Sequence, residues 1–195
     1  GLGHHIRVID NDLRGSAARL SDVAGKFELI AADVRDAEAV TAASSGAQVF
    51  LHLAALNGTE NFYNRPDVVL DVGVRGMFSA LDACEANGIK TFLLASSSEA
   101  YQTPPVIPTP ESVQLVVPDV WNPRYSYGSS KIISEVMLAN YHRDLFERAI
   151  IFRPHNVYGP DMGWEHVIPQ FALRAHDTAA ATPSGPVEFK IQGDG

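Results

Sequence analysis

Short apolar runs alternate with longer amphipathic segments along most of the chain. The runs are rich in β-branched and aromatic residues and have the length of strands; they cover residues 4–10, 27–33, 48–54, 90–96, 148–154 and 187–192. Helices are predicted between them, over residues 36–45, 66–88, 126–146 and 165–176. Because strands and helices alternate, the pattern predicts a doubly wound α/β fold, a parallel sheet with helices on both faces.

The longest irregular stretch covers residues 102–124 and contains six prolines, which interrupt regular backbone hydrogen bonding. A loop of this length in a compact domain is usually functional or disordered. It follows the sequence ASSSEAY at the end of a predicted strand and stops where the helix predicted over 126–146 begins.

Composition and charge disfavour several classes of function. The chain has 195 residues, a net charge of −8 and a pI near 5.3, and its basic residues form no cluster, which disfavours a nucleic-acid or anionic-membrane surface. No apolar run approaches the ~18 residues of a membrane span, and no signal peptide opens the sequence. The single cysteine, Cys84, cannot form an internal disulfide. These features predict a cytoplasmic protein.

The sequence YSYGSSK places Tyr127 four residues before Lys131 at the start of a predicted helix. Residues at this spacing are neighbours on a helix, and a nearby ammonium favours the phenolate. Lowering the pKa of a tyrosine by ~3 units requires ~4 kcal/mol, which a lysine and a cationic nicotinamide ring in a dry site can supply. The pair is therefore a candidate general base, although the spacing alone is common by chance.

In an open parallel sheet, ligands bind beyond the carboxyl ends of the strands. Asp10 ends the first predicted strand, where it can accept hydrogen bonds from ribose hydroxyls, and Asp33 ends the second, within reach of an adenine edge. Small residues, Ala54 and Ala55, end the third. The competing interpretation of an aspartate in such a place is a turn or helix cap.

Several other kinds of site are disfavoured. The glycine-rich phosphate fingerprint is absent, since Gly1 and Gly3 precede a strand and lack a third glycine at the required spacing. The seven histidines form no pair at metal-ligand spacing on one helix face, so no metal site is predicted. No Gly-x-Ser-x-Gly elbow is present, which disfavours a serine hydrolase.

Taken in order, the motifs VIDN, AADVRD, LHLAA, ASSSEAY, YSYGSSK and RPHNVYGP make the chain resemble the extended short-chain dehydrogenase/reductase family, specifically its NAD-dependent nucleotide-sugar epimerases and dehydratases. The resemblance covers almost the whole chain. It implies that the family's first strand and glycine-rich loop, and most of its C-terminal substrate lobe, are missing here. It also implies an incomplete dinucleotide-binding domain over residues 1–160 and the start of a substrate-binding lobe over 161–195.

The resemblance assigns roles to individual residues. Tyr127 would take a proton from a sugar hydroxyl as hydride passes to NAD, Ser97 would bind the same oxygen, and Lys131 would bind the nicotinamide ribose. The implied catalytic residues are Ser97, Glu99, Tyr127 and Lys131. The implied cofactor-binding residues are Asp10, Asn11, Asp33, Val34, Leu53, Ala54, Ala55, Tyr127, Lys131 and Pro154, and the implied substrate-binding residues are Ser98, Asn156, His166 and Val167.

The subclass stays open from the sequence. Glu99 stands where relatives that dehydrate or decarboxylate the sugar carry a glutamate, whereas 4-epimerases commonly have a non-ionisable residue there. The segment RPHNVYGPDMGW resembles GDP-mannose 3,5-epimerases. A 4,6-dehydratase, a 3,5- or 4-epimerase and a decarboxylase therefore all remain, that is, an isomerase or a lyase. Ser96 to Ser98 and Glu99 could also simply cap a turn.

The cofactor type, the oligomeric state and the substrate class can also be predicted. NAD is preferred over NADP because Asp10 would repel a 2′-phosphate, and the resemblance implies a homodimer through the helices at 66–88 and 126–146. The substrate would be a nucleoside-diphosphate sugar. The alternatives are a non-catalytic nucleotide-binding relative and an inactive fragment.

Two departures from the family bear on cofactor contacts: Gly73 replaces a common asparagine, and Gln102 replaces a common glycine.

Overall fold

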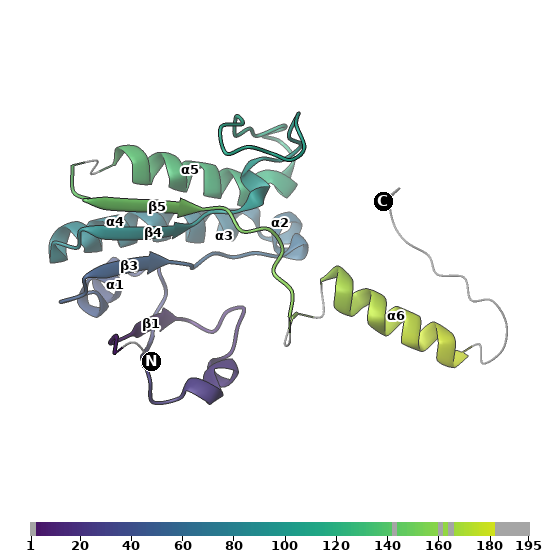
Figure 1. The fold of residues 1–195 in the computed structure, drawn as a ribbon, viewed down its shortest axis with the longest axis horizontal. Coiled ribbons are helices and arrows are strands. Elements are labelled where there is room, and N and C mark those ends of the chain that lie inside the picture. The colour runs from purple at the N-terminus through teal and green to yellow at the C-terminus, as the bar shows by residue number, and fades with distance from the viewer. Residues whose placement is uncertain (1–2, 142–143, 160–161, 164–165, 182–195) are drawn as a thin grey trace. The chain divides into compact units, whose positions relative to one another are not determined.

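The computed structural model describes residues 3–141, 144–159, 162–163 and 166–181. The chain separates into two compact units, residues 1–155 and 156–195. The first unit holds the strands and the helices around them, and the second holds one further helix (Figure 1).

Five strands form in the first unit, and all of their pairings are parallel. They are β1 (Arg7–Asp10), β2 (Glu28–Ala31), β3 (Val49–His52), β4 (Thr91–Ala95) and β5 (Arg148–Phe152). Within the described residues, β1 pairs with β2 in one sheet, and a second sheet has the order β3-β4-β5. Each strand lies within a segment predicted from the sequence; the sixth predicted strand, 187–192, falls outside the described residues.

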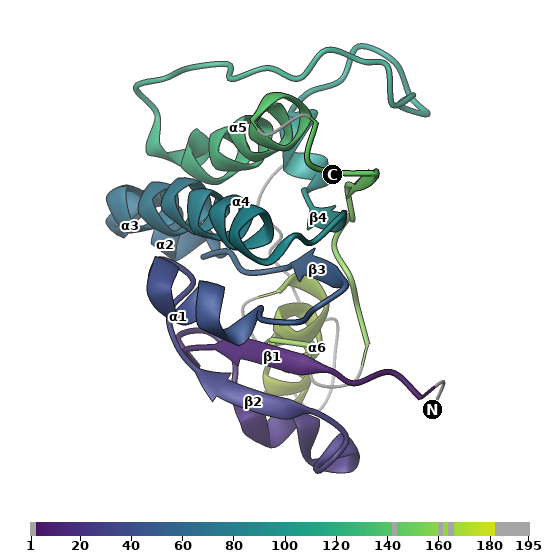
Figure 2. The same ribbon diagram turned by 90° about the vertical axis from the view of Figure 1, so that its left-hand side faces the viewer.

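Helices of the first unit lie together along one face of the strands (Figure 2). The bounds are α1 (Ala37–Ala43), α2 (Thr59–Asn64), α3 (Pro66–Leu70), α4 (Gly76–Asn87) and α5 (Ser126–Asn140). The α1 helix packs mainly against α4, and the side chain of Asp36 caps its first turn by accepting a hydrogen bond from Ala39 N at 3.0 Å. The arrangement is parallel and Rossmann-like, as the alternating pattern predicts, but the helices among the described residues of this unit lie along one face of the strands, where the pattern predicts helices on both faces.

The core lies between the β3-β4-β5 sheet and helices α4 and α5. Its fully buried side chains include Met77, Leu81, Phe92 and Leu94, and the Phe92 ring stacks on that of Phe50 with centroids 5.4 Å apart. Cys84 belongs to this cluster, and burial raises the pKa of its thiol to about 12. The cysteine is therefore a packing residue, as the sequence indicates.

The segment predicted as one helix over 66–88 is interrupted. Between α3 and α4, residues Asp71–Arg75 form a π-helical turn. Gly73 lies in this turn, and a Cβ added there would stand 2.6 Å from the Cβ of Ser130 on α5. The absence of a side chain at position 73 thus permits a close contact between the π-helical turn and the helix that carries Tyr127 and Lys131.

The helix predicted over 126–146 ends earlier, at Asn140, with Tyr141 as its C-cap in an extended conformation. The α2 helix and a 3₁₀ segment at Ala17–Val23 were not predicted. In the second unit, α6 (Val167–Ala181) overlaps the helix predicted over 165–176 and continues beyond it.

Candidate active site

Tyr127 is the second residue of α5 and is buried. A 3₁₀ turn, Pro123–Tyr125, leads into the helix, and the side chain of Asn122 caps this turn by accepting a hydrogen bond from Arg124 N at 3.0 Å. Asparagine followed by proline is a favourable start for a helical segment. The local sequence therefore fixes where the helix begins and, with it, the position of the phenol.

Ser97 lies just beyond the carboxyl end of β4. Hydrogen bonds from Ser96 N to Phe152 O at 2.8 Å and from Ser98 N to Pro154 O at 3.0 Å continue the pairing of β4 and β5 past the strand ends. The Ser97 hydroxyl accepts from Glu99 N at 3.2 Å and lies near enough to the side chain of Tyr127 to lower the pKa of the phenol. It thus both caps a turn and meets the phenol, so the two interpretations of this serine are compatible.

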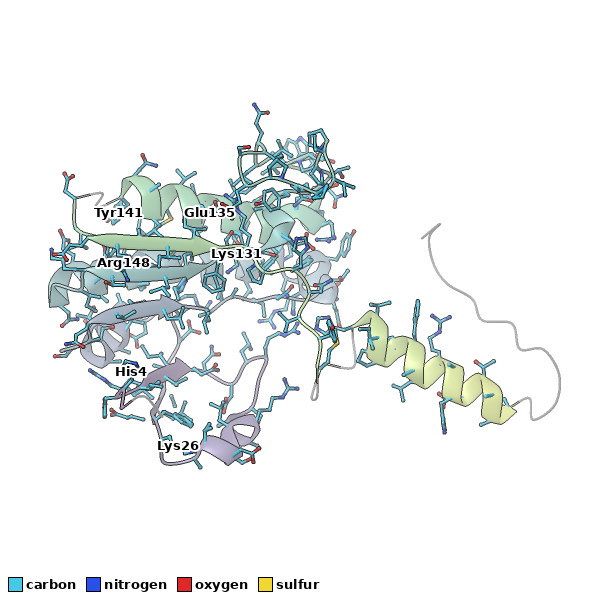
Figure 3. The ribbon with its side chains drawn as sticks, in the orientation of Figure 1. His4, Lys26, Lys131, Glu135, Tyr141 and Arg148 are labelled. Carbon is cyan, nitrogen blue, oxygen red and sulfur yellow. The ribbon has the colours of Figure 1, made fainter. Side chains whose placement is uncertain are left out.

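Lys131 lies one turn after Tyr127 on α5, near the carboxyl ends of the strands (Figure 3). Its Nζ donates to the carbonyl oxygen of Ala95 at 2.7 Å and lies 5.6 Å from the centroid of the Tyr127 ring. Burial lowers the pKa of this ammonium to about 8. Ser97, from the turn after β4, is therefore brought together with Tyr127 and Lys131, which lie on α5.

Without a cofactor, the pKa of Tyr127 is raised, whereas the lowering predicted from the sequence depends on Lys131 together with a cationic nicotinamide ring. Burial raises this pKa and the negative charge of Glu99 adds to the rise, while Ser97 and the charge of Arg14 act against it. Removing a phenol from water disfavours its anion. In the protein alone, Tyr127 is held as a neutral phenol.

Glu99 is in a two-point ion pair with Arg124. The guanidinium donates from Nη1 to Oε2 at 3.0 Å and from Nη2 to Oε1 at 2.9 Å, and both side chains are about one third exposed, at 31% each. The same guanidinium lies over the ring of Phe62, 5.2 Å from its centroid. Phe62 in turn stacks on Tyr127, with centroids 5.3 Å apart and an angle of 17° between the rings.

Arg124 and Phe62 are site residues that the sequence analysis missed. Arg124 stands three residues before Tyr127 and could have been found from its place beside YSYGSSK. Phe62 lies on α2, a helix of six residues whose pattern is too short to be recognised.

A second group of predicted residues lines a hollow beyond the ends of β1, β2 and β3. Its lining includes Asp10, Asn11, Arg14, Asp33, Val34, Ala54, Ala55 and Leu56. Asp10 accepts a hydrogen bond from Asp12 N at 2.7 Å, as a turn-capping aspartate does, and remains exposed. Ala54 and Ala55 form a wall of small side chains, while the preceding Leu53 is exposed.

The carboxylate oxygens of Asp33 accept hydrogen bonds from neighbouring protein groups at almost all of their acceptor positions. One oxygen accepts from Arg35 N and Nε, each at 2.9 Å, and the other accepts from Arg35 Nη2 at 2.8 Å and from Asn11 Nδ2 at 2.9 Å. These contacts lower the pKa of Asp33 to about 2. A carboxylate offers about four acceptor positions, so an adenine amino group would have to displace one donor, and the Asn11 amide is the uncharged side-chain donor among them.

Close backbone approaches shape both groups of residues. Val34 packs against Gly76 at the start of α4, where an added Cβ would stand 2.6 Å from Val34 Cγ1. Gly128, next to Tyr127, has the carbonyl oxygen of Glu99 and the side-chain amide of Gln102 against it. Gln102 adopts a left-handed backbone with φ of 52°, a conformation that favours glycine, and its side chain donates to Glu99 O.

The remaining predicted site residues lie in the turn after β4, after β5 and in the second unit. Ser98 is half-buried in the turn after β4, and Pro154 is half-buried and accepts from Ser98 N. Asn156, His166 and Val167 lie in the second unit, where Asn156 and Val167 are exposed and His166 N donates to Gly163 O at 3.0 Å. Their roles toward a substrate stay predictions.

Neither a metal site nor a membrane-spanning helix is found in the part of the chain that the structure describes. No group of three or more His, Cys, Asp or Glu side chains in that part is arranged to hold a metal ion. None of the helices formed by those residues is long and apolar enough to cross a bilayer.

Comparison with known proteins gives a consistent result. The model of the family described as "NAD dependent epimerase/dehydratase family" matches residues 1–195. A dTDP-glucose 4,6-dehydratase from Mycobacterium tuberculosis is 26% identical over 156 residues, 80% of this chain and 46% of that protein. A GDP-mannose 3,5-epimerase from Arabidopsis thaliana is 29% identical over 167 residues, 84% of this chain and 43% of that protein.

Among solved structures, a dTDP-glucose 4,6-dehydratase from Streptomyces venezuelae with NAD and TYD bound is similar, with a TM-score of 0.78 and 25% identity. The match covers 89% of this chain and 53% of that one. The chain thus spans about half the length of the relatives it matches. Since the family model matches the chain from end to end, the protein belongs to the NAD-dependent epimerase/dehydratase family.

Proposed function

We propose that the protein is an NAD-dependent epimerase or dehydratase that acts on a nucleoside-diphosphate sugar through a transient keto-sugar, with Tyr127 as the base. The observation that carries the proposal is the cluster at the carboxyl end of β4: Ser97 near the Tyr127 phenol, whose pKa it lowers, and the Lys131 ammonium 5.6 Å from the centroid of the Tyr127 ring. The similar proteins named above act on dTDP-glucose and GDP-mannose, which supports this substrate class.

The residues that line the hollow beyond the ends of β1, β2 and β3 fit the adenosine half of NAD. Asp10 offers a carboxylate at a strand end for the ribose hydroxyls, and Ala54 and Ala55 leave room for a flat ring. Val34 turns its side chain toward α4, so its backbone remains for a ligand. When bound, NAD supplies the hydride acceptor.

The chain's own residues handle the proton. Tyr127 accepts it from a sugar hydroxyl, and Ser97 donates a hydrogen bond to the same oxygen. Lys131, whose pKa is about 8, is mostly protonated at neutral pH and stabilises the phenolate. Because burial raises the pKa of Tyr127 in the protein alone, the base forms only once further positive charge enters the site.

The Glu99–Arg124 pair bears on the subclass. The Glu99 carboxylate accepts one hydrogen bond from Arg124 on each oxygen and has acceptor positions left over. A carboxylate placed in this way suits a base that removes a C–H proton beside the keto group. It favours a reaction beyond plain 4-epimerisation, such as dehydration, 3,5-epimerisation or decarboxylation.

A homodimer through α4 and α5 is part of the proposal. Ile133, Val136 and Phe78 are exposed on these helices, and Tyr141 packs edge-on against Phe78 with centroids 5.4 Å apart. An exposed apolar surface on two neighbouring helices is typical of a protein interface. The cytoplasmic location expected from the sequence stays a prediction.

Replacing Tyr127 tests the function. In the 195-residue chain, Tyr127→Phe should reduce conversion of a nucleotide sugar by 10²-fold or more, roughly the contribution of a general base. Conversion of dTDP-glucose, GDP-mannose and UDP-galactose in the presence of NAD is followed by chromatography. NAD retention, measured by mass spectrometry after denaturation, should be similar in both proteins.

Tyr125→Phe is the matched control, since Tyr125 is a neighbouring tyrosine in the turn before α5. It should keep the turnover of the unaltered chain. Full turnover by Tyr127→Phe would exclude Tyr127 as the base. Bound NAD with no conversion of any sugar would favour the alternative, a non-catalytic nucleotide-binding relative.

A further inference from the structure

We propose that Arg124 is a positioning residue for Tyr127, acting on it through the charge of Glu99 and through the ring of Phe62. The inference rests on the proposed function only in taking Tyr127 as the base. Its experiment measures the tyrosine itself and needs no turnover.

The first route is electrostatic. Arg124 meets both carboxylate oxygens of Glu99, at 3.0 and 2.9 Å. Glu99 N donates to the Ser97 hydroxyl at 3.2 Å, and both Ser97 and Glu99 act on the pKa of the Tyr127 phenol. A carboxylate near a phenol opposes loss of the phenol's proton, because two negative charges would then face each other. By pairing with Glu99, Arg124 weakens that repulsion.

The second route is steric. The guanidinium lies 5.2 Å from the centroid of Phe62, and the rings of Phe62 and Tyr127 stack at 5.3 Å. Phe62 is 3% exposed, so it has little freedom to leave this column. Guanidinium, phenyl and phenol thus form one stack whose outer end is fixed by Glu99.

The charged and hydrogen-bonding groups around Tyr127 come from several elements. Ser97 and Glu99 lie in the turn after β4, Arg14 follows β1, and Lys131 stands one turn further along α5. Arg124 is placed to counter Glu99, the group among these that raises the phenol pKa by its charge. A purely structural tie between the two turns would have no effect on the titration of Tyr127 once the fold is intact.

The experiment titrates Tyr127 by NMR in the 195-residue chain carrying tyrosine labelled with ¹³C at Cζ. The chain has six tyrosines, and the resonance of Tyr127 is the one missing from Tyr127→Phe. In Arg124→Met the pKa of Tyr127 should rise by about 1 unit, since Glu99 is left uncompensated. Arg124→Lys keeps a cation without the two-point contact and should give a smaller rise.

Glu99→Gln provides the reciprocal change and lowers the pKa of Tyr127. In Arg124→Met combined with Glu99→Gln, the pKa should return to the value of the unaltered chain or below. Far-ultraviolet circular dichroism checks the fold of each variant across the titration. If Arg124→Met does not fold, Glu99→Gln alone still tests the electrostatic route.

An unchanged pKa in folded Arg124→Met, or in Glu99→Gln, would overturn the inference. So would a rise in Arg124→Met that persists in the double variant, because the effect would then not pass through Glu99. The proposed function fails by a separate result, full turnover by Tyr127→Phe, so the two failures are distinguishable.

Discussion

Burial of the Lys131 ammonium has opposite consequences for chemistry and for stability. The side chain is 4% exposed, and its Nζ donates a hydrogen bond to Ala95 O. Burial lowers its pKa from an ordinary 10.5 to about 8. A buried cation placed beside a phenol stabilises the phenolate, but it destabilises the folded chain relative to an apolar side chain of similar size.

Lys131→Met should therefore abolish turnover and yet stabilise the fold at pH 7, by about 1–2 kcal/mol after the lost hydrogen bond is counted. Between pH 8 and 10.5 the unfolded chain binds more protons at this site than the folded chain does, so this lysine makes the free energy of unfolding rise with pH there. Denaturant unfolding at pH 7 and pH 10 should show that rise diminished in the variant.

Lys90→Met is the matched control, since Lys90 is exposed. It should leave both the free energy of unfolding and its pH dependence nearly unchanged. Equal stability of Lys131→Met and the unaltered chain at pH 7, with the same pH dependence, would contradict the burial argument.

At the residue level, the sequence predicts contacts that are close along the chain better than contacts across it. The helical spacing of Tyr127 and Lys131 and the strand-end position of Ser97 could be inferred from pattern. The stack of Arg124, Phe62 and Tyr127 could not, because Phe62 reaches the site only through the packing of α2 beside the turn before α5. The rise of the Tyr127 pKa in the protein alone could not be predicted either, since burial cannot be inferred from a four-residue spacing.

Among the elements, the π-helical turn Asp71–Arg75 shows how a single glycine permits close packing between this turn and a neighbouring helix. Hydrophobic spacing predicts one helix over 66–88, and the prediction is right in type but misses the turn, which depends on Ser130 of a distant helix. The π-helical turns of proteins often lie beside functional sites. Here the turn lies against the helix that carries Tyr127 and Lys131.

Gly73→Ala should destabilise the protein by about 1–3 kcal/mol, because its Cβ would stand 2.6 Å from Ser130 Cβ and the two helices would have to separate. Thermal unfolding followed by circular dichroism measures the effect. Gly15→Ala is the control, since no atom lies within 4 Å of a Cβ added there. Combining Gly73→Ala with Ser130→Gly should restore part of the loss; a Gly73→Ala protein as stable as Gly15→Ala would contradict the contact.

For the whole molecule, the parallel α/β architecture could be predicted because strands and helices alternate with strong patterns. The division of the strands into two sheets could not, because hydrophobic pattern marks strands without saying which of them pair. The exposed apolar residues on α4 and α5 are likewise visible only in the fold, since the same residues could equally have belonged to a buried stripe.

Val136→Asp should shift the proposed dimer toward monomer, since a charge would be buried at the centre of the helix pair. Sedimentation velocity at micromolar concentrations measures the change. Val120→Asp is the control, because Val120 is exposed on the proline-rich loop and belongs to neither α4 nor α5. A Val136→Asp chain with the same sedimentation as the unaltered chain would exclude this surface as the interface.

The pairing of β1 with β2 alone, among the described residues, has a consequence for ligand affinity. Two paired strands are marginally stable in water, whereas β4 is held between two neighbours. Amide hydrogens of β1 and β2 are therefore expected to exchange with solvent sooner than those of β4. Asp10 and Asp33 stand at the ends of this weaker pair, so a nucleotide that contacts them binds only when the pair is closed. Its apparent dissociation constant would then report the local opening equilibrium of two short strands as well as the contacts themselves.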